Sequence, residues 1–325
     1  MTARFCITLD DVRSAAIRIQ DSIIRTPVVS SPLINDLLHT EVFFKCENLQ
    51  HIGAFKARGA CNAVFSLTAE EAAAGVVTHS SGNHAAALAR AASLRNIAAH
   101  IVMPHDSAAV KISAVRGFGV EPTFCEPTAE SRQATAEQVM ADTGATFVHP
   151  YNDAGVIAGQ GTAAVELFED VARLDAVIVP VGGGGLLSGS LVALKALKPG
   201  IKVFAAEPKW ADDAFRSLVS GRIESPTRYD TIADGLRTPL GSLTFPIIQN
   251  LVDEILTVDE DSIRRATAAM LQMGKLLVEP SGAVPLAVLM QHGEPFRGQR
   301  VGVIVSGGNV DPQTLQEILR EAALR

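Results

Sequence analysis

Short apolar runs rich in β-branched residues alternate along the chain with longer, alanine-rich amphipathic stretches. The short runs predict strands at residues 42–46, 76–79, 98–103, 120–125, 176–181, 203–206 and 301–305. The longer stretches predict helices at residues 83–94, 110–116, 129–142 and 186–197. Strands that alternate with helices are typical of parallel sheets covered by helices on both faces. We therefore expect an α/β fold with open, mainly parallel sheets and with ligands at the C-terminal ends of the strands.

The composition indicates a folded protein with a hydrophobic core and no membrane-spanning segment. The chain is 47% hydrophobic and 19% charged, which is enough apolar sequence to bury a core. The net charge of −7 disfavours binding to nucleic acid or to an anionic membrane, because such proteins usually present a basic face. We find neither an apolar run long enough to span a membrane nor the apolar segment of a secretion signal.

The number and spacing of the cysteines are those of a cytoplasmic protein. Cys6, Cys46, Cys61 and Cys125 are widely spaced and form no close pair, so they predict neither a disulfide framework nor a structural zinc site. We expect all four to be small buried or half-buried apolar side chains. Together these features predict a cytoplasmic protein.

A glycine run between a predicted strand and a predicted helix is the first candidate for chemistry. Gly182, Gly183, Gly184 and Gly185 follow the strand at residues 176–181. Without Cβ atoms, their backbone N–H groups can approach an anion closely, and the start of the following helix adds its dipole. This pattern predicts a phosphate-binding cup. The alternative is a flexible linker, but its position between a buried strand and a helix argues against that.

Three further segments carry candidate groups. Ser81, Gly82 and Asn83 follow a strand and either bind a carboxylate or simply cap the next helix. Lys56 lies among small and apolar residues and is either a buried nucleophile or a surface lysine. Ser306, which precedes two glycines after the last strand, either contacts a flat ligand or belongs to a tight turn.

A phosphate cup, a carboxylate site, a reactive lysine and a hydroxyl at a strand end are the parts needed to hold pyridoxal phosphate and an amino acid. The chain resembles the serine/threonine dehydratase group of fold type II pyridoxal-phosphate enzymes, and within it serine racemases and threo-3-hydroxyaspartate dehydratases. The resemblance covers nearly the whole chain. It is carried by the glycine run and by Phe55-Lys56-x-Arg58-Gly59-Ala60, Ser80-Ser81-Gly82-Asn83-His84, Gly159-Gln160-Gly161-Thr162 and Ser306-Gly307-Gly308-Asn309.

The resemblance implies a role for each matching residue. Lys56 would hold the cofactor covalently, Phe55 would pack beside it, Asn83 would bind its ring hydroxyl and Ser306 its ring nitrogen. The cofactor phosphate would bind at Gly182, Gly183, Gly184, Gly185 and Leu186. The substrate would contact Ser80, Ser81, Gly82, Asn83, His84, Arg132 and Tyr151.

The implied reaction is the β-elimination of a 3-hydroxy amino acid, by dehydration and deamination, to a 2-oxo acid and ammonia. Lys56 would remove the α-proton, and the cofactor would act as an electron sink. Ser81 matches the second base of serine racemases, so an amino-acid racemase is the alternative. The lysine motif differs from that of β-replacement enzymes, and the presence of the lysine counts against a non-catalytic sensor.

The substrate stays open at this point. Serine and threonine are the default. Arg132 either binds a second carboxylate, as in 3-hydroxyaspartate, or is an ordinary arginine on a helix surface. Tyr151 and Phe118 would instead favour an aryl group, as in 3-phenylserine.

The resemblance also implies the organisation of the protein and a metal site. Residues 1–67 and 149–325 would form a large cofactor-binding domain, residues 68–148 a small mobile domain, and the protein would be a homodimer. Glu207, the carbonyl of Ala211 and Asp213 would bind Mg²⁺, Ca²⁺ or Mn²⁺, since oxygen ligands suit these ions. The alternative for this segment is a solvated acidic loop.

Overall fold

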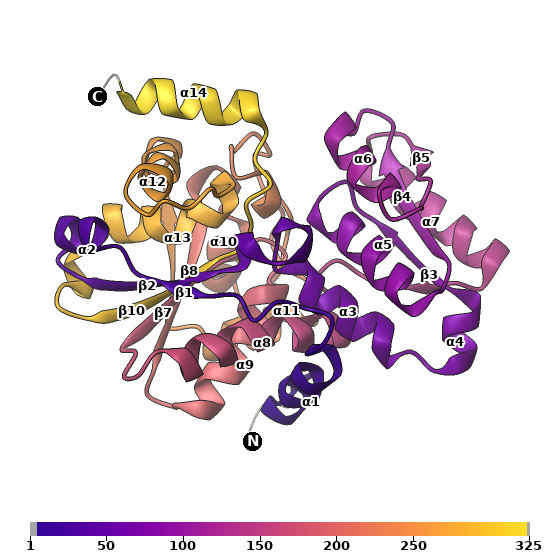
Figure 1. The fold of residues 1–325 in the computed structure, drawn as a ribbon, viewed down its shortest axis with the longest axis horizontal. Helices are drawn as coiled ribbons and strands as arrows, with labels where there is room; N and C mark the ends of the chain where they lie inside the picture. The colour runs from indigo at the N-terminus through magenta and orange to yellow at the C-terminus, as the bar shows by residue number, and fades with distance from the viewer. Residues whose placement is uncertain (1–4, 324–325) are drawn as a thin grey trace.

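The computed structural model describes residues 5–323 and contains two sheets flanked by helices (Figure 1). The larger sheet has the strand order β1-β2-β10-β7-β8-β9, and the smaller has the order β5-β4-β3-β6. The strands of the larger sheet are β1 (Val28–Val29), β2 (Glu41–Cys46), β7 (Ala176–Pro180), β8 (Lys202–Pro208), β9 (Glu254–Val258) and β10 (Arg300–Val305). Those of the smaller sheet are β3 (Val76–His79), β4 (Ala99–Pro104), β5 (Thr123–Cys125) and β6 (Thr146–Phe147). Only β1 pairs antiparallel with its neighbour, and all other pairs are parallel.

The larger sheet is buried on both faces because its strands are apolar at successive positions. Along β7, Val177 and Val179 pack into one hydrophobic cluster, whereas Ala176 and Ile178 pack into the other. Alternate side chains of a strand point to opposite faces, so a continuous apolar run is what a sheet covered on both sides requires. One face is covered by α1 (Leu9–Ile19), α8 (Ala154–Asp170), α9 (Gly185–Leu197) and α11 (Thr244–Leu251), and the other by α2 (Pro32–Leu38), α12 (Glu260–Gln272) and α13 (Pro280–Gln291).

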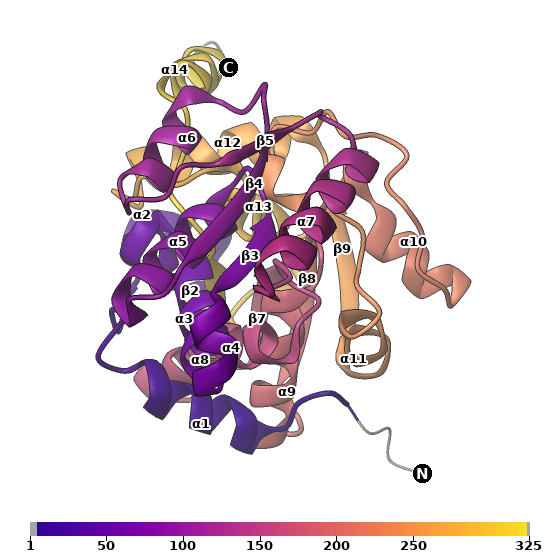
Figure 2. The same ribbon diagram turned by 90° about the vertical axis from the view of Figure 1, so that its right-hand side faces the viewer.

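The smaller sheet follows the same rule. On β3, Val76 packs toward α3 (Lys56–Ser66) and α5 (Asn83–Arg95), whereas Val77 packs toward α7 (Ala129–Thr143). Figure 2 shows this sheet in front, with α5 and α7 on its two sides. The remaining helices are α4 (Ala69–Ala74), α6 (Ala109–Arg116), α10 (Asp213–Ser220) and α14 (Pro312–Ala323).

The α/β fold with mainly parallel sheets is confirmed, and every predicted strand and helix occurs with small shifts of its ends. One boundary was wrong: the strand expected at residues 120–125 begins only at Thr123. Pro122 precedes it, and proline has no N–H to donate to a neighbouring strand. One cysteine was also wrong, since Cys6 is exposed, whereas Cys46, Cys61 and Cys125 are buried. Among residues 5–323, none of the helices is both long and apolar enough to cross a membrane.

Candidate active site

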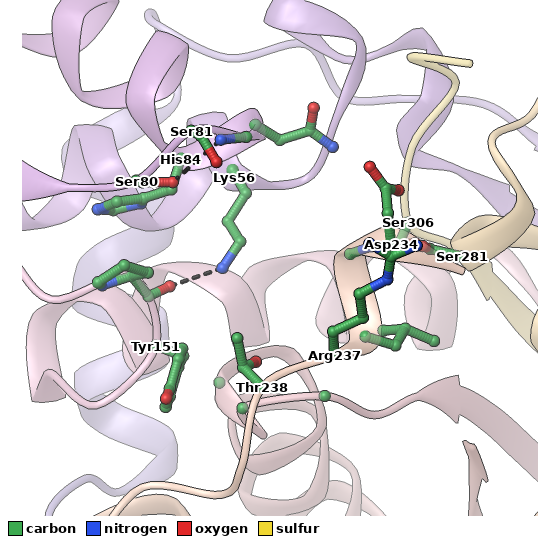
Figure 3. Close-up of a pocket in the computed structure, with 18 of the residues that line it drawn as sticks. Lys56, Ser80, Ser81, His84, Tyr151, Asp234, Arg237, Thr238, Ser281 and Ser306 are labelled. Atoms are coloured by element: carbon green, nitrogen blue, oxygen red, sulfur yellow. Dashed lines mark hydrogen bonds between the residues drawn. The ribbon is translucent and has the colours of Figure 1, made fainter. Parts of the chain in front are cut away.

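A cavity of about 820 Å³ is lined by the segments that follow β3 and β6 of the smaller sheet and β7 and β10 of the larger one (Figure 3). Parallel strands bring the loops at their carboxyl ends to one edge of a sheet, and here the two sheets contribute to one cavity. Every residue predicted to bind cofactor or substrate lines it. These residues are Phe55, Lys56, Ser80, Ser81, Gly82, Asn83, His84, Arg132, Tyr151, Gly182, Gly183, Gly184, Gly185, Leu186 and Ser306.

Lys56 is the first residue of α3 and projects into this cavity (Figure 3). Its Nζ donates a hydrogen bond to the carbonyl oxygen of Pro150 at 2.6 Å and lies 5.1 Å from the centroid of the Phe55 ring. Burial lowers the pKa of Lys56 to about 8, because the charged form loses solvation. The surface-lysine alternative is therefore wrong, and a useful fraction of this amine is uncharged near neutral pH.

The glycine run forms a buried turn between β7 and α9. Residues 182–185 are all buried, so the flexible-linker alternative is wrong. Gly184 has φ +87°, which L side chains rarely adopt, and a Cβ on Gly183 would lie 2.3 Å from Cγ of Tyr151. Within the described residues, the backbone N–H groups of residues 182–186 have no hydrogen-bond acceptor. Unpaired donors at the start of a helix suit the oxygens of a phosphate.

The turn before α5 leaves part of its donors free: among the described residues, the backbone N–H groups of Ser81, Asn83 and His84 have no acceptor, whereas that of Ser80 donates to Val102. Gly82 is the N-cap of α5 and makes no side-chain capping bond, so neither Ser81 nor Asn83 caps the helix as in the alternative. Oγ of Ser80 accepts a hydrogen bond from the N–H of Gly82 at 3.3 Å. The imidazole of His84 is buried with Nε2 3.2 Å from the carbonyl oxygen of Val148, and burial holds its pKa well below the usual value. These features suit a carboxylate-binding turn held in place by a neutral histidine.

Glu279, just before α13, lines the cavity and was not predicted from the sequence. Burial raises its pKa to about 7, and nearby Asp234 adds to the shift. Both carboxylate oxygens accept from Nδ2 of Asn83 at 3.2 Å, while Oδ1 of Asn83 accepts from Nδ2 of Asn309 at 2.9 Å. Asn83, at the start of α5, thus links the part of the molecule around the smaller sheet to two segments that belong to the larger one. Ser306, directly after β10, is 3% exposed and lines the same cavity, near Asp234 and Ser281 in Figure 3.

An aromatic wall and an arginine bound the other side of the cavity. The rings of His149 and Tyr151 meet edge to face, with centroids 4.5 Å apart, and burial lowers the pKa of His149 to about 4. Arg132 is half-buried and lines the cavity, and its Nε donates to the carbonyl oxygen of Thr128 on the same helix at 3.3 Å. The expectation for Phe118 was wrong: this ring packs against the hydrophobic cluster beneath α3 and α5, outside the cavity.

Of the three predicted cation ligands, Glu207 lies near the end of β8, Ala211 in the short turn that follows, and Asp213 at the start of α10; none of them lines the cavity. Glu207 accepts hydrogen bonds from the backbone N–H groups of Ala214 and Phe215 at 2.7 and 2.9 Å. Both oxygens of Asp213 are buried without a hydrogen-bond partner, and burial raises the pKa of this carboxyl to about 7. The solvated-loop alternative is wrong, since Glu207 and Asp213 are each 1% exposed.

The fold and this cavity define the class of fold type II enzymes that use pyridoxal phosphate. The chain belongs to the pyridoxal-phosphate dependent enzyme family, whose model matches residues 19–307. It is 48% identical over 319 residues to a serine racemase of Dictyostelium discoideum, covering 96% of this chain and 98% of that protein. It is 50% identical over 304 residues to a beta-hydroxyaspartate dehydratase of Paracoccus denitrificans (strain Pd 1222), covering 94% and 96%. The structure of the processed form of threonine deaminase isoform 2 from Solanum lycopersicum superposes with a TM-score of 0.90 at 32% identity, covering 96% of this chain and 94% of that one.

Proposed function

We propose that the protein catalyses the β-elimination of a 3-hydroxy amino acid to a 2-oxo acid and ammonia. One observation carries the proposal: the Lys56 amine, with its lowered pKa, faces a cavity whose walls hold free N–H groups of both the glycine run and the Ser80–His84 turn. The first wall suits a phosphate and the second a carboxylate. A base between two anion sites is the arrangement that an amino acid bound to pyridoxal phosphate requires.

The residues of the cavity fit this cofactor. Among the described residues, the N–H groups of the glycine run have no acceptor, and the hydroxyl of Ser306, just after β10, would bind the ring nitrogen. Phe55 gives a flat apolar surface beside Lys56, and Asn83 lies within the same wall. When bound, pyridoxal phosphate withdraws electrons from the α-carbon of an amino acid and so acidifies its proton.

Different groups of the protein bind the substrate and transfer its proton. The N–H groups at the start of α5 hold the substrate carboxylate, and the uncharged amine of Lys56 removes the α-proton. Loss of the β-hydroxyl as water and hydrolysis of the resulting enamine as its imine give the 2-oxo acid and ammonia. Residues 68–148 act as a mobile domain that closes over the site and excludes water. The ion pair between Lys111 and Asp234, at 3.0 Å, joins α6 to the larger part of the molecule across this cavity.

The β-substituent of the substrate is best matched by a second carboxylate, as in 3-hydroxyaspartate. Arg132 lines the cavity, and among residues 5–323 its guanidinium donates only through Nε, to the carbonyl oxygen of Thr128, so a carboxylate there would occupy its terminal nitrogens. Replacing it (Arg132→Gln) should raise the KM for 3-hydroxyaspartate about tenfold or more and leave that for threonine nearly unchanged. Arg116→Gln is the matched control, since Arg116 pairs with Glu121 on the surface. Equal effects on both substrates would exclude this assignment.

A racemase is the second candidate. Ser81 lies on the turn that lines the cavity and does not cap α5, and we propose that its hydroxyl serves as a second base. A base on each side of the α-carbon would let a proton leave from one face and return to the other.

We also propose a divalent cation at Glu207, the Ala211 carbonyl and Asp213. The support is the buried, unpaired carboxylate of Asp213, which a cation would compensate. No group of three or more His, Cys, Asp and Glu side chains suited to a metal occurs in the described part of the chain, so water would complete the shell. Mg²⁺, Ca²⁺ or Mn²⁺ would brace the loop after β8, next to the strand that leads into the phosphate cup.

The experiment that tests the function is an assay of ammonia and 2-oxo acid across 3-hydroxy amino acids of both configurations, with the Lys56→Ala protein as control. The proposal expects the two products in equal amounts from at least one substrate, and neither from the control. Interconversion of serine isomers without ammonia would assign the racemase instead. A cytoplasmic homodimer is proposed on the resemblance alone, and light scattering of the holoenzyme tests its oligomeric part.

A further inference from the structure

Arg58 lies two residues after Lys56 in the first turn of α3, and the two side chains point in nearly opposite directions. Side chains two residues apart on an α-helix differ in direction by about 200°, so Arg58 projects away from the cavity that Lys56 faces. The Arg58 side chain is fully buried. Nε and Nη2 donate to the two oxygens of Glu47, each at 2.8 Å, and Nη1 and Nη2 donate to the two oxygens of Glu166 at 2.7 and 2.8 Å. One guanidinium therefore holds two carboxylates, each in a bidentate pair.

Lys45 completes a buried cluster with no net charge. Its Nζ donates to Oε2 of Glu166 at 2.6 Å and to the carbonyl oxygen of Thr26 at 2.6 Å. The hydroxyl of Thr26 donates to Glu47 at 2.5 Å. Lys45, Glu47, Arg58 and Glu166 form what we term the charge cluster. It contains two positive and two negative groups, and each of them is hydrogen bonded.

The charge cluster joins three elements around the start of α3. Lys45 lies on β2 and Glu47 directly after it, whereas Glu166 belongs to α8. Thr162 of α8 also accepts from Nη1 of Arg58 at 3.1 Å. The two helices approach so closely here that a Cβ on Gly159 would lie 2.7 Å from Cα of Gly59. The Gly159-Gln160-Gly161-Thr162 motif, which contributes nothing to the cavity, thus contacts the back of the turn that carries Lys56.

We propose that Arg58 is a positioning residue for Lys56: through the charge cluster it fixes the first turn of α3 so that the Lys56 amine stays opposite the phosphate cup. A buried charge network is not in general more stable than apolar packing of the same volume, so a gain in stability does not account for it. The charge cluster instead fixes the Arg58 side chain, because two bidentate pairs define both the position and the orientation of a guanidinium. This inference rests on Lys56 being the cofactor lysine.

The test compares Arg58→Lys with Val64→Ala. An ammonium has three donors and cannot form two bidentate pairs. Val64 is fully buried on the same helix, outside the charge cluster, and its truncation destabilises α3 without touching the first turn. Each protein is incubated with increasing pyridoxal phosphate and treated with borohydride, and mass spectrometry gives the fraction of Lys56 that carries the cofactor. Thermal unfolding of the same samples gives the loss of stability.

We expect Arg58→Lys to raise the half-saturating cofactor concentration about 100-fold, since a displacement of about 1 Å has effects of that order, and Val64→Ala to lower the melting temperature with little change in cofactor capture. Thr162→Val removes a single bond to Arg58 and should shift capture in the same direction by less. If Arg58→Lys does not fold, the Thr162→Val variant alone tests the positioning role of Arg58. The inference is overturned if cofactor capture weakens as much in Val64→Ala as in the Arg58 or Thr162 variant. It is also overturned if the Arg58 and Thr162 variants capture the cofactor as well as the wild type does. Cofactor on another lysine of the wild-type protein would instead overturn the assignment of Lys56 itself.

Discussion

Replacing Gly183 by alanine tests the phosphate cup through a single methyl group. The new Cβ would lie 2.3, 2.4 and 2.5 Å from Cγ, Cδ1 and Cδ2 of Tyr151. Carbon atoms in contact are about 3.5–4.0 Å apart, so the ring must retreat by more than about 1 Å. Overpacking of this kind costs about 1–3 kcal/mol.

We expect this free-energy cost in cofactor binding rather than in the stability of the cofactor-free protein, because the cavity beside Tyr151 is empty only without cofactor. Without cofactor, the Tyr151 ring can move into the cavity of about 820 Å³, so the melting temperature should change little. With cofactor bound, that space is filled and the strain remains. Gly183→Ala should therefore weaken binding of pyridoxal phosphate by about tenfold to a hundredfold. Gly200→Ala is the control, since nothing lies within 4 Å of its Cβ position.

The assay is equilibrium binding of pyridoxal phosphate to protein stripped of cofactor, followed by the change in protein fluorescence. Tyr151→Ala in the Gly183→Ala background removes the clash and should restore most of the lost affinity. Cofactor affinity in Gly183→Ala equal to that in Gly200→Ala would refute the reasoning. So would a double variant that binds no better than Gly183→Ala alone.

Three further predictions follow from individual groups. Ser81→Ala should abolish formation of a D-isomer while elimination of an L-substrate continues, and an equal loss of both in chiral chromatography and ammonia assays would make Ser81 purely structural. Because burial holds the pKa of His149 near 4, the unfolded chain binds a proton that the folded chain excludes, so stability conferred at neutral pH is lost as pH falls from about 6.5 to 4. His149→Gln should be less stable than wild type at pH 7, with a gap in melting temperature that narrows toward pH 4; parallel curves would contradict this. Chelation by EDTA should lower the melting temperature, Mg²⁺ should restore it, and Asp213→Asn should be indifferent to both, whereas a wild-type protein indifferent to EDTA would exclude the cation.

The strands that could be predicted are those whose burial comes from their own residues. β7 is apolar at every position, and such a run is read directly from the sequence. β9 carries Glu254 at its exposed first position and lies at the edge of its sheet, so only its pairing with β8 identifies it. β1 and β6 have two residues each, too few to show any period.

The cavity residues divide in the same way. The glycine run could be found because it follows a predicted strand, and Lys56 because a lysine is unusual in a stretch of small and apolar residues. Glu279 could not, because it follows no strand and enters the cavity only through the packing of α13 against the larger sheet. Arg58 appeared in a recognised motif, yet its partner Glu166 lies 108 residues away, and no local pattern joins the two. Contacts set by tertiary packing therefore account for what the sequence left out.

The central claim is that the Lys56 amine, placed between two anion-binding turns, holds the cofactor. The most direct measurement is mass spectrometry of the wild-type holoenzyme after borohydride reduction and proteolysis. The account predicts a phosphopyridoxyl group on the peptide that contains Lys56, and none on Lys111, which lines the same cavity. A modified Lys111 with an unmodified Lys56 would contradict it.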